Sequence, residues 1–234
     1  MSRGLFAALD AVGLNLQAVF NLDDLPADIV GRLRGLDDPA SRYRQLILVG
    51  HAGKTLWEAV QASGRVSADP IDAFSVQQVA QWLDANLAGC ACEIVYPGDT
   101  PVGLQTLGRI AGWHHPSPFM VGINEVWGSW YAYRVVALAA SDLPPSTPRP
   151  SRSPCDSCLT RSCVSSCPAG ALAGGVFALD RCLAYRQAAA SLCAATCLAR
   201  VSCPVGAAHR YDDAQLAHTY SISLRAVKAA VCSR

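Results

Sequence analysis

The sequence predicts an α/β domain followed by a small cysteine-rich domain. Strand-like apolar segments alternate with amphipathic helical segments over the first part of the chain, as in α/β layer folds. Five prolines in the fourteen residues from Ser141 to Pro154 exclude a helix or a central strand there. Eight of the eleven cysteines fall between Cys155 and Cys203. The expected parts are a first domain at 1–140, a proline-rich linker at 141–154 and a second domain at 155–234.

Composition limits the class of protein. Hydrophobic residues make up 51% and charged residues 16% of the 234 residues, which indicates a compact chain with a substantial core. No apolar run reaches the roughly 18 residues that a membrane helix needs. Asp10 and Asn15 interrupt the apolar N-terminal segment and no small-x-small cleavage motif follows, which favours an ordinary first helix over a signal peptide. We therefore expect a cytoplasmic protein without a membrane partner.

Periodicity and turn residues predict the elements in order. Asp69-Pro-Ile-Asp72 predicts a helix start with Asp69 or Asp72 as the N-cap. Cys90 and Cys92 point to one face of a strand and are predicted to be core residues. The expected helices lie at 3–12, 29–33, 55–62, 69–87, 102–112 and 213–231, and the expected strands at 14–20, 45–49, 90–96, 119–123 and 131–140.

Charge differs between the two parts of the chain. The residues up to Pro150 carry ten Lys and Arg against fourteen Asp and Glu, a net charge of −4. From Ser151 onward, nine Lys and Arg face four Asp, a net charge of +5. A basic patch can indicate nucleic acid. Bound four-iron clusters, each with about −2 in the oxidised state with its thiolates, would also compensate this excess.

The cysteine spacing distinguishes between a disulfide framework and a metal site. A reducing compartment and the odd count of eleven argue against disulfides. Structural zinc usually needs paired Cys-x2–4-Cys knuckles, which interleaved single cysteines and two Cys-Pro pairs fit poorly. The first half, Cys155-x2-Cys158-x4-Cys163-x3-Cys167-Pro168, instead resembles an iron–sulfur segment with a stretched middle gap. The second half, with Cys182, Cys193, Cys197 and Cys203-Pro204, departs further from that pattern.

The sequence therefore predicts two 4Fe–4S clusters. In two-cluster ferredoxins the fourth cysteine of each run ligates the other cluster. A helix over 182–199 would bring three cysteines of the second half to one face, although the same spacing fits a plain buried stripe. The predicted ligands are Cys155, Cys158, Cys163 and Cys203 for one cluster and Cys167, Cys182, Cys193 and Cys197 for the other.

Several short motifs carry a family resemblance. Cys155–Leu172 and Asp180-Arg-Cys182-Leu-Ala-Tyr185 resemble the ferredoxin module of epoxyqueuosine reductases and reductive dehalogenases. Asp99-Thr-Pro101, Ala111-Gly-Trp113, Ile123-Asn124 and Gly128-Ser-Trp130-Tyr131 resemble segments of the reductase. Asp69-Pro-Ile-Asp72 and the strand after Gly128 are similar to the cobalamin-trafficking chaperone. The resemblance implies a nitroreductase-like α/β domain that holds a corrinoid.

The resemblance also implies roles for particular residues. Asp99 matches a proton donor, which would need a pKa raised by partial burial, whereas its alternative role is to form a turn. Trp130 and Tyr131 could pack on a corrinoid face, or they could belong to the sheet core. Gly128 would let the backbone approach the macrocycle. The implied corrinoid-binding residues are Thr100, Pro101, Asn124, Gly128, Ser129, Trp130 and Tyr131.

The expected activity is an iron–sulfur oxidoreductase that reduces cobalamin and removes its upper ligand. Its electrons would come from a low-potential donor such as a flavodoxin- or ferredoxin-type reductase. The acidic first part and the short segment after Cys203 make nucleic acid an unexpected partner. The alternatives are a corrinoid-dependent reductase of another substrate and a simple electron carrier whose first domain only docks a partner.

Overall fold

The computed structural model describes residues 4–33, 42–148 and 150–232, with side chains as far as residue 228. The chain divides into two compact units. The first unit comprises Met1–Gly112 and Tyr131–Pro150, and the second comprises Trp113–Trp130 and Ser151–Arg234. The segment 113–130 thus groups with the cysteine-rich part, although the sequence suggested no link between them.

The first unit is built on an antiparallel sheet. Its strand order is β1-β2-β4-β3, and each neighbouring pair is antiparallel. Every residue of the central strand β2 is buried. The strands are β1 (Leu16–Asn21), β2 (Gln45–Ala52), β3 (Cys92–Tyr96) and β4 (Tyr131–Ala139).

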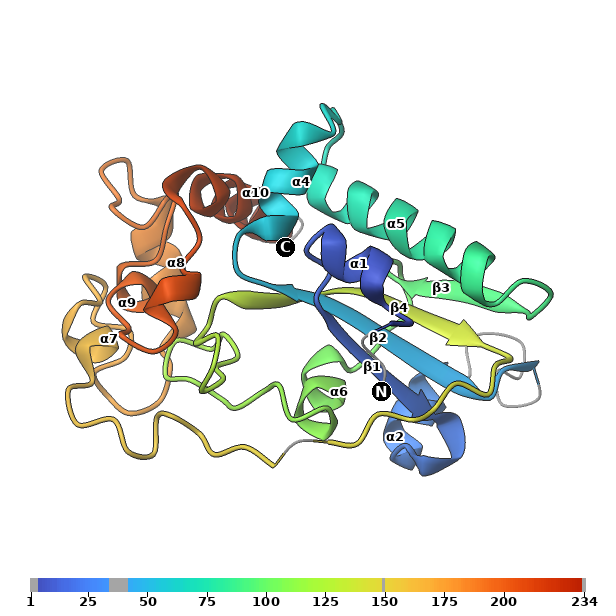
Figure 1. The fold of residues 1–234 in the computed structure, drawn as a ribbon. Helices are drawn as coiled ribbons and strands as arrows, with labels where there is room; N and C mark the ends of the chain where they lie inside the picture. The colour runs from blue at the N-terminus through green and yellow to red at the C-terminus, as the bar shows by residue number, and fades with distance from the viewer. Residues whose placement is uncertain (1–3, 34–41, 149, 233–234) are drawn as a thin grey trace. The chain divides into compact units, whose positions relative to one another are not determined.

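Helices cover both faces of this sheet (Figure 1). On one face, α1 (Ala7–Ala11), α4 (Thr55–Ala62) and α5 (Pro70–Asn86) share a core with apolar sheet residues such as Ile47 and Val135. The 3-10 helix η1 (Leu22–Asp24) leads from β1 towards α2 (Ala27–Leu33), which lies with α6 (Leu104–Ile110) on the other face in Figure 1. The predicted α/β fold class is confirmed.

The cap of α5 follows the prediction. The side chain of Asp69 accepts a hydrogen bond from the backbone N–H of Asp72 at 3.1 Å, and Pro70 is the first helical residue. The expected helix at 3–12 is shorter, as α1, and residue 3 lies outside the described residues.

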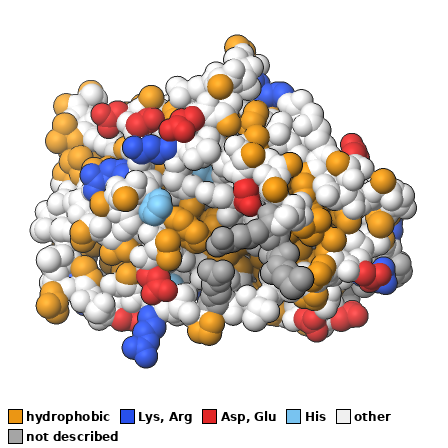
Figure 2. Space-filling model, in the orientation of Figure 1, with side chains coloured by type: hydrophobic (Ala, Val, Ile, Leu, Met, Phe, Trp, Pro, Cys, Tyr) orange, Lys and Arg blue, Asp and Glu red, His pale blue; other side chains and the backbone are white. Residues whose placement is uncertain are grey.

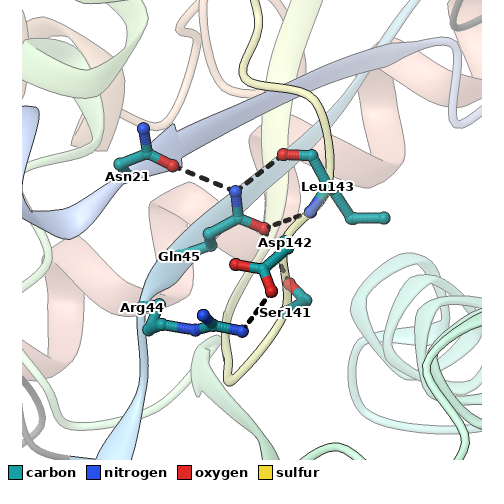
Figure 3. Close-up of polar contacts among 6 residues, drawn as sticks. All are labelled: Asn21, Arg44, Gln45, Ser141, Asp142 and Leu143. Carbon is teal, nitrogen blue, oxygen red and sulfur yellow. Dashed lines mark hydrogen bonds and ion pairs between the residues drawn. The ribbon is translucent and has the colours of Figure 1, made fainter.

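The first residues of the proline-rich segment, 141–146, are extended and pack on the first unit, and we call them the strap. Ser146 donates its N–H to the Val19 carbonyl at 2.8 Å, and the Val19 N–H donates to the Ser146 hydroxyl at 3.0 Å. These bonds cover part of the free edge of β1. The buried Gln45 side chain makes four hydrogen bonds (Figure 3). Three of them anchor the strap through Ser141 and both backbone groups of Leu143, and the fourth goes to Asn21 at the end of β1.

The second unit consists of short helices joined by turns. Helix α7 packs against α9, and α8 packs against α10. Segment 113–130 adds isolated bridges between His115 and Ile123 and between Asn124 and Gly128. The helices are α7 (Ser162–Ser165), α8 (Leu179–Gln187), α9 (Leu198–Val201), η2 (Ala207–His209) and α10 (Asp213–Cys232). None of the helices that the structure describes is long and apolar enough to span a bilayer.

Three expectations about local structure were wrong. Residues 119–123 form no strand, because Met120 has a left-handed backbone with φ 64°. Residues 182–199 do not form one helix, because Ala188 is extended (ψ 145°) and ends α8. Cys90 is exposed rather than part of the core, since it lies in the turn before β3; Cys92 is half-buried.

Candidate functional site

Four cysteines of the second unit lie close enough to influence one another's ionisation. Burial raises the pKa of the Cys155 thiol, and the neighbouring Cys203, Cys163 and Cys158 raise it further. Burial likewise raises the pKa of Cys163, with Cys203 and Cys158 adding to the effect. We refer to Cys155, Cys158, Cys163 and Cys203 as the first cysteine group.

The other four cysteines form a second neighbourhood. Burial raises the pKa of the Cys182 thiol, followed by the effect of Cys197 and smaller effects of Cys167 and Cys193. Burial also raises the pKa of Cys193, and Cys197 and Cys167 contribute in the same direction. We refer to Cys167, Cys182, Cys193 and Cys197 as the second cysteine group.

The packing of α7 on α9 explains why each group combines distant parts of the sequence. The Ser162 hydroxyl donates to the Ser202 carbonyl at 2.9 Å, which ties the start of α7 to the end of α9. Cys163 and Cys203 therefore meet in the first group. Each short helix is followed by a Cys-Pro pair, and the Cys167-Pro pair after α7 leads into the second group instead. This exchange is the pattern of two-cluster ferredoxins.

A cavity of about 320 Å³ adjoins the second cysteine group. All four of its cysteines line the cavity, together with apolar residues such as Phe119, Leu172 and Phe177. Arg186 and Tyr220 also reach its wall. A thiol-lined space in apolar surroundings suits a buried iron–sulfur cluster, because a low dielectric and few waters tune its potential.

The donor set fits iron–sulfur clusters. Among the described residues, no group of three or more His, Cys, Asp or Glu side chains is placed to bind a single metal ion. In a four-iron cluster each thiolate binds a different iron, so the four sulfurs stand farther apart than the ligands of one ion. Two sets of four neighbouring thiols match that requirement in number and chemistry.

Arg186 is the cation nearest to the second cysteine group on α8. It follows Cys182 by one helical turn, and its Nε donates to the Cys193 carbonyl at 3.4 Å. Its other nitrogens bind the Tyr220 carbonyl and the Ser223 hydroxyl, both at 3.2 Å. These three bonds hold a positive charge against the cavity wall. Arg186 was not among the predicted site residues, although its i+4 spacing from Cys182 is visible in the sequence.

Asn124 and Gly128, expected at a corrinoid, have structural roles in the second unit. The Asn124 side chain accepts the N–H groups of Val126 at 2.7 Å and Trp127 at 3.2 Å, and so it forms the turn that follows. Gly128 has φ 58°, and a Cβ there would lie 2.0 Å from the Val205 carbonyl oxygen. The glycine therefore permits a close approach to the turn after Cys203.

A buried arginine contacts both Ser129 and Trp130. Arg200 on α9 is 5% exposed and donates to both the hydroxyl and the carbonyl of Ser129. Its guanidinium lies 4.5 Å from the Trp130 ring centroid and 5.1 Å from that of Tyr211. Trp130 is fully buried. It packs with Tyr211 and Leu216 of the second unit rather than in the sheet core, and its role at a corrinoid stays a prediction.

The remaining predicted residues lie in the first unit. Asp99 is exposed in the turn after β3, so in this conformation its carboxyl lacks the partial burial that a proton donor would need. Thr100 is half-buried and Pro101 exposed in the same turn. Tyr131 begins β4, is buried, and makes an edge-to-face contact with Tyr133 at 6.0 Å. Burial raises the pKa of Tyr133 to about 12.

A partly buried polar cluster in the first unit was not predicted from the sequence. Arg134 on β4 donates from Nε to His51 Nδ1 at 3.0 Å and from a terminal nitrogen to Asp72 at 3.3 Å. Burial raises the pKa of Asp72, and Arg134 opposes that shift. The cluster ties the start of α5 to β2 and β4. His51, Asp72 and Arg134 are too far apart in sequence to form a recognisable motif.

The charged side chains do not gather into one basic surface on the face shown in Figure 2. Lys and Arg occur there in small separate groups among apolar and uncharged atoms.

Comparisons with known proteins identify the fold. No protein-family profile matches the sequence, and no curated protein is similar to it. An epoxyqueuosine reductase from Bacillus subtilis superposes with a TM-score of 0.56 at 12% identity, over 91% of this chain and 67% of that one. An epoxyqueuosine reductase with a modified tRNA-Tyr stem loop gives 0.58 at 11% identity, over 93% and 68%.

The fold is also shared with a second kind of reductase. The catabolic reductive dehalogenase NpRdhA gives a TM-score of 0.52 at 14% identity and covers 97% of this chain but 34% of its own. At these identities the likeness establishes a common fold. The chain thus has the fold of the epoxyqueuosine reductases and of part of a reductive dehalogenase.

Proposed function

We propose that this chain is an iron–sulfur oxidoreductase that reduces a bound corrinoid. The observation that carries the proposal is the separation of eight cysteines into two groups of four neighbouring thiols. The first cysteine group would hold one 4Fe–4S cluster and the second would hold another. Such clusters supply single electrons at low potential.

The corrinoid part of the proposal has separate support. It rests on the motif resemblance around Asp99 and Gly128, together with the fold shared with three reductase structures. Four residues of the expected corrinoid site, from Asn124 to Trp130, are engaged within the second unit. The candidates that remain are Thr100, Pro101 and Tyr131 in the first unit.

Cobalamin itself is the favoured substrate, and removal of its upper ligand is the favoured reaction. The resemblance of Asp69–Asp72 and of the strand after Gly128 to the cobalamin-trafficking chaperone supports it. A second candidate is the reduction of a modified tRNA base, because a relative in fold is described in complex with a tRNA stem loop. Fluorescence anisotropy with a tRNA anticodon stem loop separates the two: tight, salt-sensitive binding would favour the second candidate.

Titration with cobalamin under anaerobic conditions tests whether a corrinoid binds. We expect the absorption spectrum to change to that of base-off cobalamin, with saturation near one corrinoid per chain. An unchanged spectrum at high protein concentration would contradict corrinoid binding and favour a simple electron carrier.

Asp99 is the proposed proton donor. Its turn is exposed, and a donor needs partial burial to keep its proton near neutral pH. The Bacillus subtilis epoxyqueuosine reductase is described with its catalytic aspartate loop swung out of the active site, which suggests that the Asp99 turn also closes over a substrate.

Replacement of the Asp99 carboxyl tests that role. Asp99→Asn should lower the turnover rate by about 100-fold or more, because general acid catalysis contributes about 10²–10⁴-fold. Corrinoid affinity should stay unchanged in the same titration. The exposed Asp84→Asn, on α5 of the first unit, is the matched control. Turnover of Asp99→Asn at the wild-type rate would remove Asp99 from the mechanism.

A further inference from the structure

The turn that follows Cys158 presents an unusual surface beside the first cysteine group. Leu159 is 97% exposed. Among the described residues, it is the most exposed apolar side chain that neighbours one of the eight cysteines in sequence. Isolated exposed leucines are common on proteins. Leu159, however, is bonded directly to a cysteine of the candidate electron-transfer site.

The backbone of this turn is held in a costly conformation. Arg161 has φ 40° and ψ 38°, in the left-handed region, which costs a non-glycine residue about 1–2 kcal/mol. In this conformation its N–H reaches the Cys158 thiol, and the Thr160 hydroxyl lies 3.8 Å from the same sulfur. The turn thus wraps the sulfur while leaving Leu159 in solvent. Strain of this kind often marks a functional loop.

Cys158, like Cys155, is partly exposed, whereas the other two thiols of the first cysteine group are not. Cys163 and Cys203 are buried, as is Cys193 of the second group. An electron that arrives at this turn has a short path through Cys158.

The charge around the turn points to an acidic partner. Arg161 and Arg152 are exposed, and Asp156 is the opposing charge nearby in sequence. An exposed apolar residue beside arginines matches the composition of small protein interfaces, in which Arg is enriched and charge complementarity steers the encounter.

We propose that the turn Cys158–Arg161 is the docking point for an acidic, low-potential electron-carrier protein. This inference rests on the proposed function, since it requires a cluster at the first cysteine group. One electron leaves the reduced carrier and enters the cluster bound through Cys158; the carrier is oxidised, the cluster is reduced, and no covalent bond changes. Redox encounters bury little area, so one leucine and one arginine form a substantial part of the contact.

Stopped-flow reduction of the iron-loaded protein tests the inference. The probe is reduced flavodoxin, and the signal is the bleaching of iron–sulfur absorption at about 400 nm. Leu159→Ser and Arg161→Gln should each lower the second-order rate constant by about tenfold at low salt, and Leu159→Glu should lower it further through charge repulsion. Dithionite, which needs no docking surface, should reduce all variants at the wild-type rate.

Leu192→Ser is the matched control. Leu192 is 64% exposed and precedes Cys193, so it occupies the corresponding place beside the second cysteine group. Flavodoxin should reduce this variant at the wild-type rate. Slow reduction of Leu192→Ser with normal reduction of Leu159→Ser would overturn the inference, as would equal rates for all variants.

Two further outcomes separate the causes of failure. A loss of rate that appears equally with dithionite would place the effect on the cluster and would overturn docking at this turn. Iron analysis precedes the kinetics. Wild-type protein without iron contradicts the proposed function itself, whereas iron-loaded variants with unchanged flavodoxin rates contradict only the docking point.

Discussion

Gly128 shows how one residue can fit two explanations until its neighbours are known. The sequence suggested that it lets the backbone approach a flat macrocycle. In the structure it lets the chain approach Val205 and Gly206, where a Cβ on Gly206 would in turn lie 2.3 Å from the Gly128 nitrogen. The partner segment lies more than seventy residues away in sequence, so no local pattern could reveal the contact.

Substitution of Gly128 measures the importance of this contact. Gly128→Ala adds a clash to the cost of φ 58°, and it should lower the melting temperature by about 6–12 °C, since about 1 kcal/mol corresponds to about 2–4 °C at this chain length. Gly170→Ala is the matched control, because it has φ 59° with nothing within 4 Å. It should lower the melting temperature by about 2–8 °C, from the cost of its φ alone and less than Gly128→Ala. Equal shifts would contradict the close contact.

Arg186 is expected to tune the cluster at the second cysteine group. A fixed positive charge at the cavity wall stabilises the reduced, more negative state of a cluster. Arg186→Gln should therefore lower one of two midpoint potentials by an amount on the order of tens of millivolts, and Arg186→Lys should largely retain the wild-type value.

Redox titration followed by electron paramagnetic resonance provides the measurement. Arg181→Gln is the control, since Arg181 is adjacent to Cys182 in sequence but exposed, so that solvent screens its charge. A shift in both potentials, or an equal shift with Arg181→Gln, would contradict a specific effect of Arg186.

Elements with strong local patterns were predicted well, and irregular segments were not. The capped helix α5, the buried strand β2 and the long strand β4 follow from spacing and capping chemistry alone. The proline-rich segment was expected to be a tether, yet its first residues are a strap on β1. Proline content excludes regular structure there, but it does not show what an extended segment packs against.

Gln45 is the anchor of this strap. Gln45→Leu keeps the side-chain size but leaves the Ser141 hydroxyl and both Leu143 backbone groups without their partner, at a cost of about 2–4 kcal/mol. Urea unfolding measures the loss. Exposed Gln77→Leu should change stability by less than about 0.5 kcal/mol. A similar small change for Gln45→Leu would show that the strap is not anchored there.

At the scale of the whole molecule, the grouping of the cysteines was more predictable from the sequence than the corrinoid site. Cysteines and prolines at fixed offsets were enough to predict which thiols lie together. The reason is that one pattern, in which the last cysteine of each run joins the other group, holds for both runs. The corrinoid site depends on side chains from separate segments. Several of them proved to be engaged with Arg200 and Val205, which no spacing rule could indicate.

The central claim is that eight cysteines hold two four-iron clusters, and metal analysis of anaerobically purified protein tests it most directly. We expect about eight irons and about eight sulfides per chain, with a broad absorption shoulder near about 400 nm. Cys182→Ser and Cys163→Ser should each affect one cluster only. Stoichiometric zinc without iron would contradict the account. So would an iron content of about four per chain that neither variant lowers.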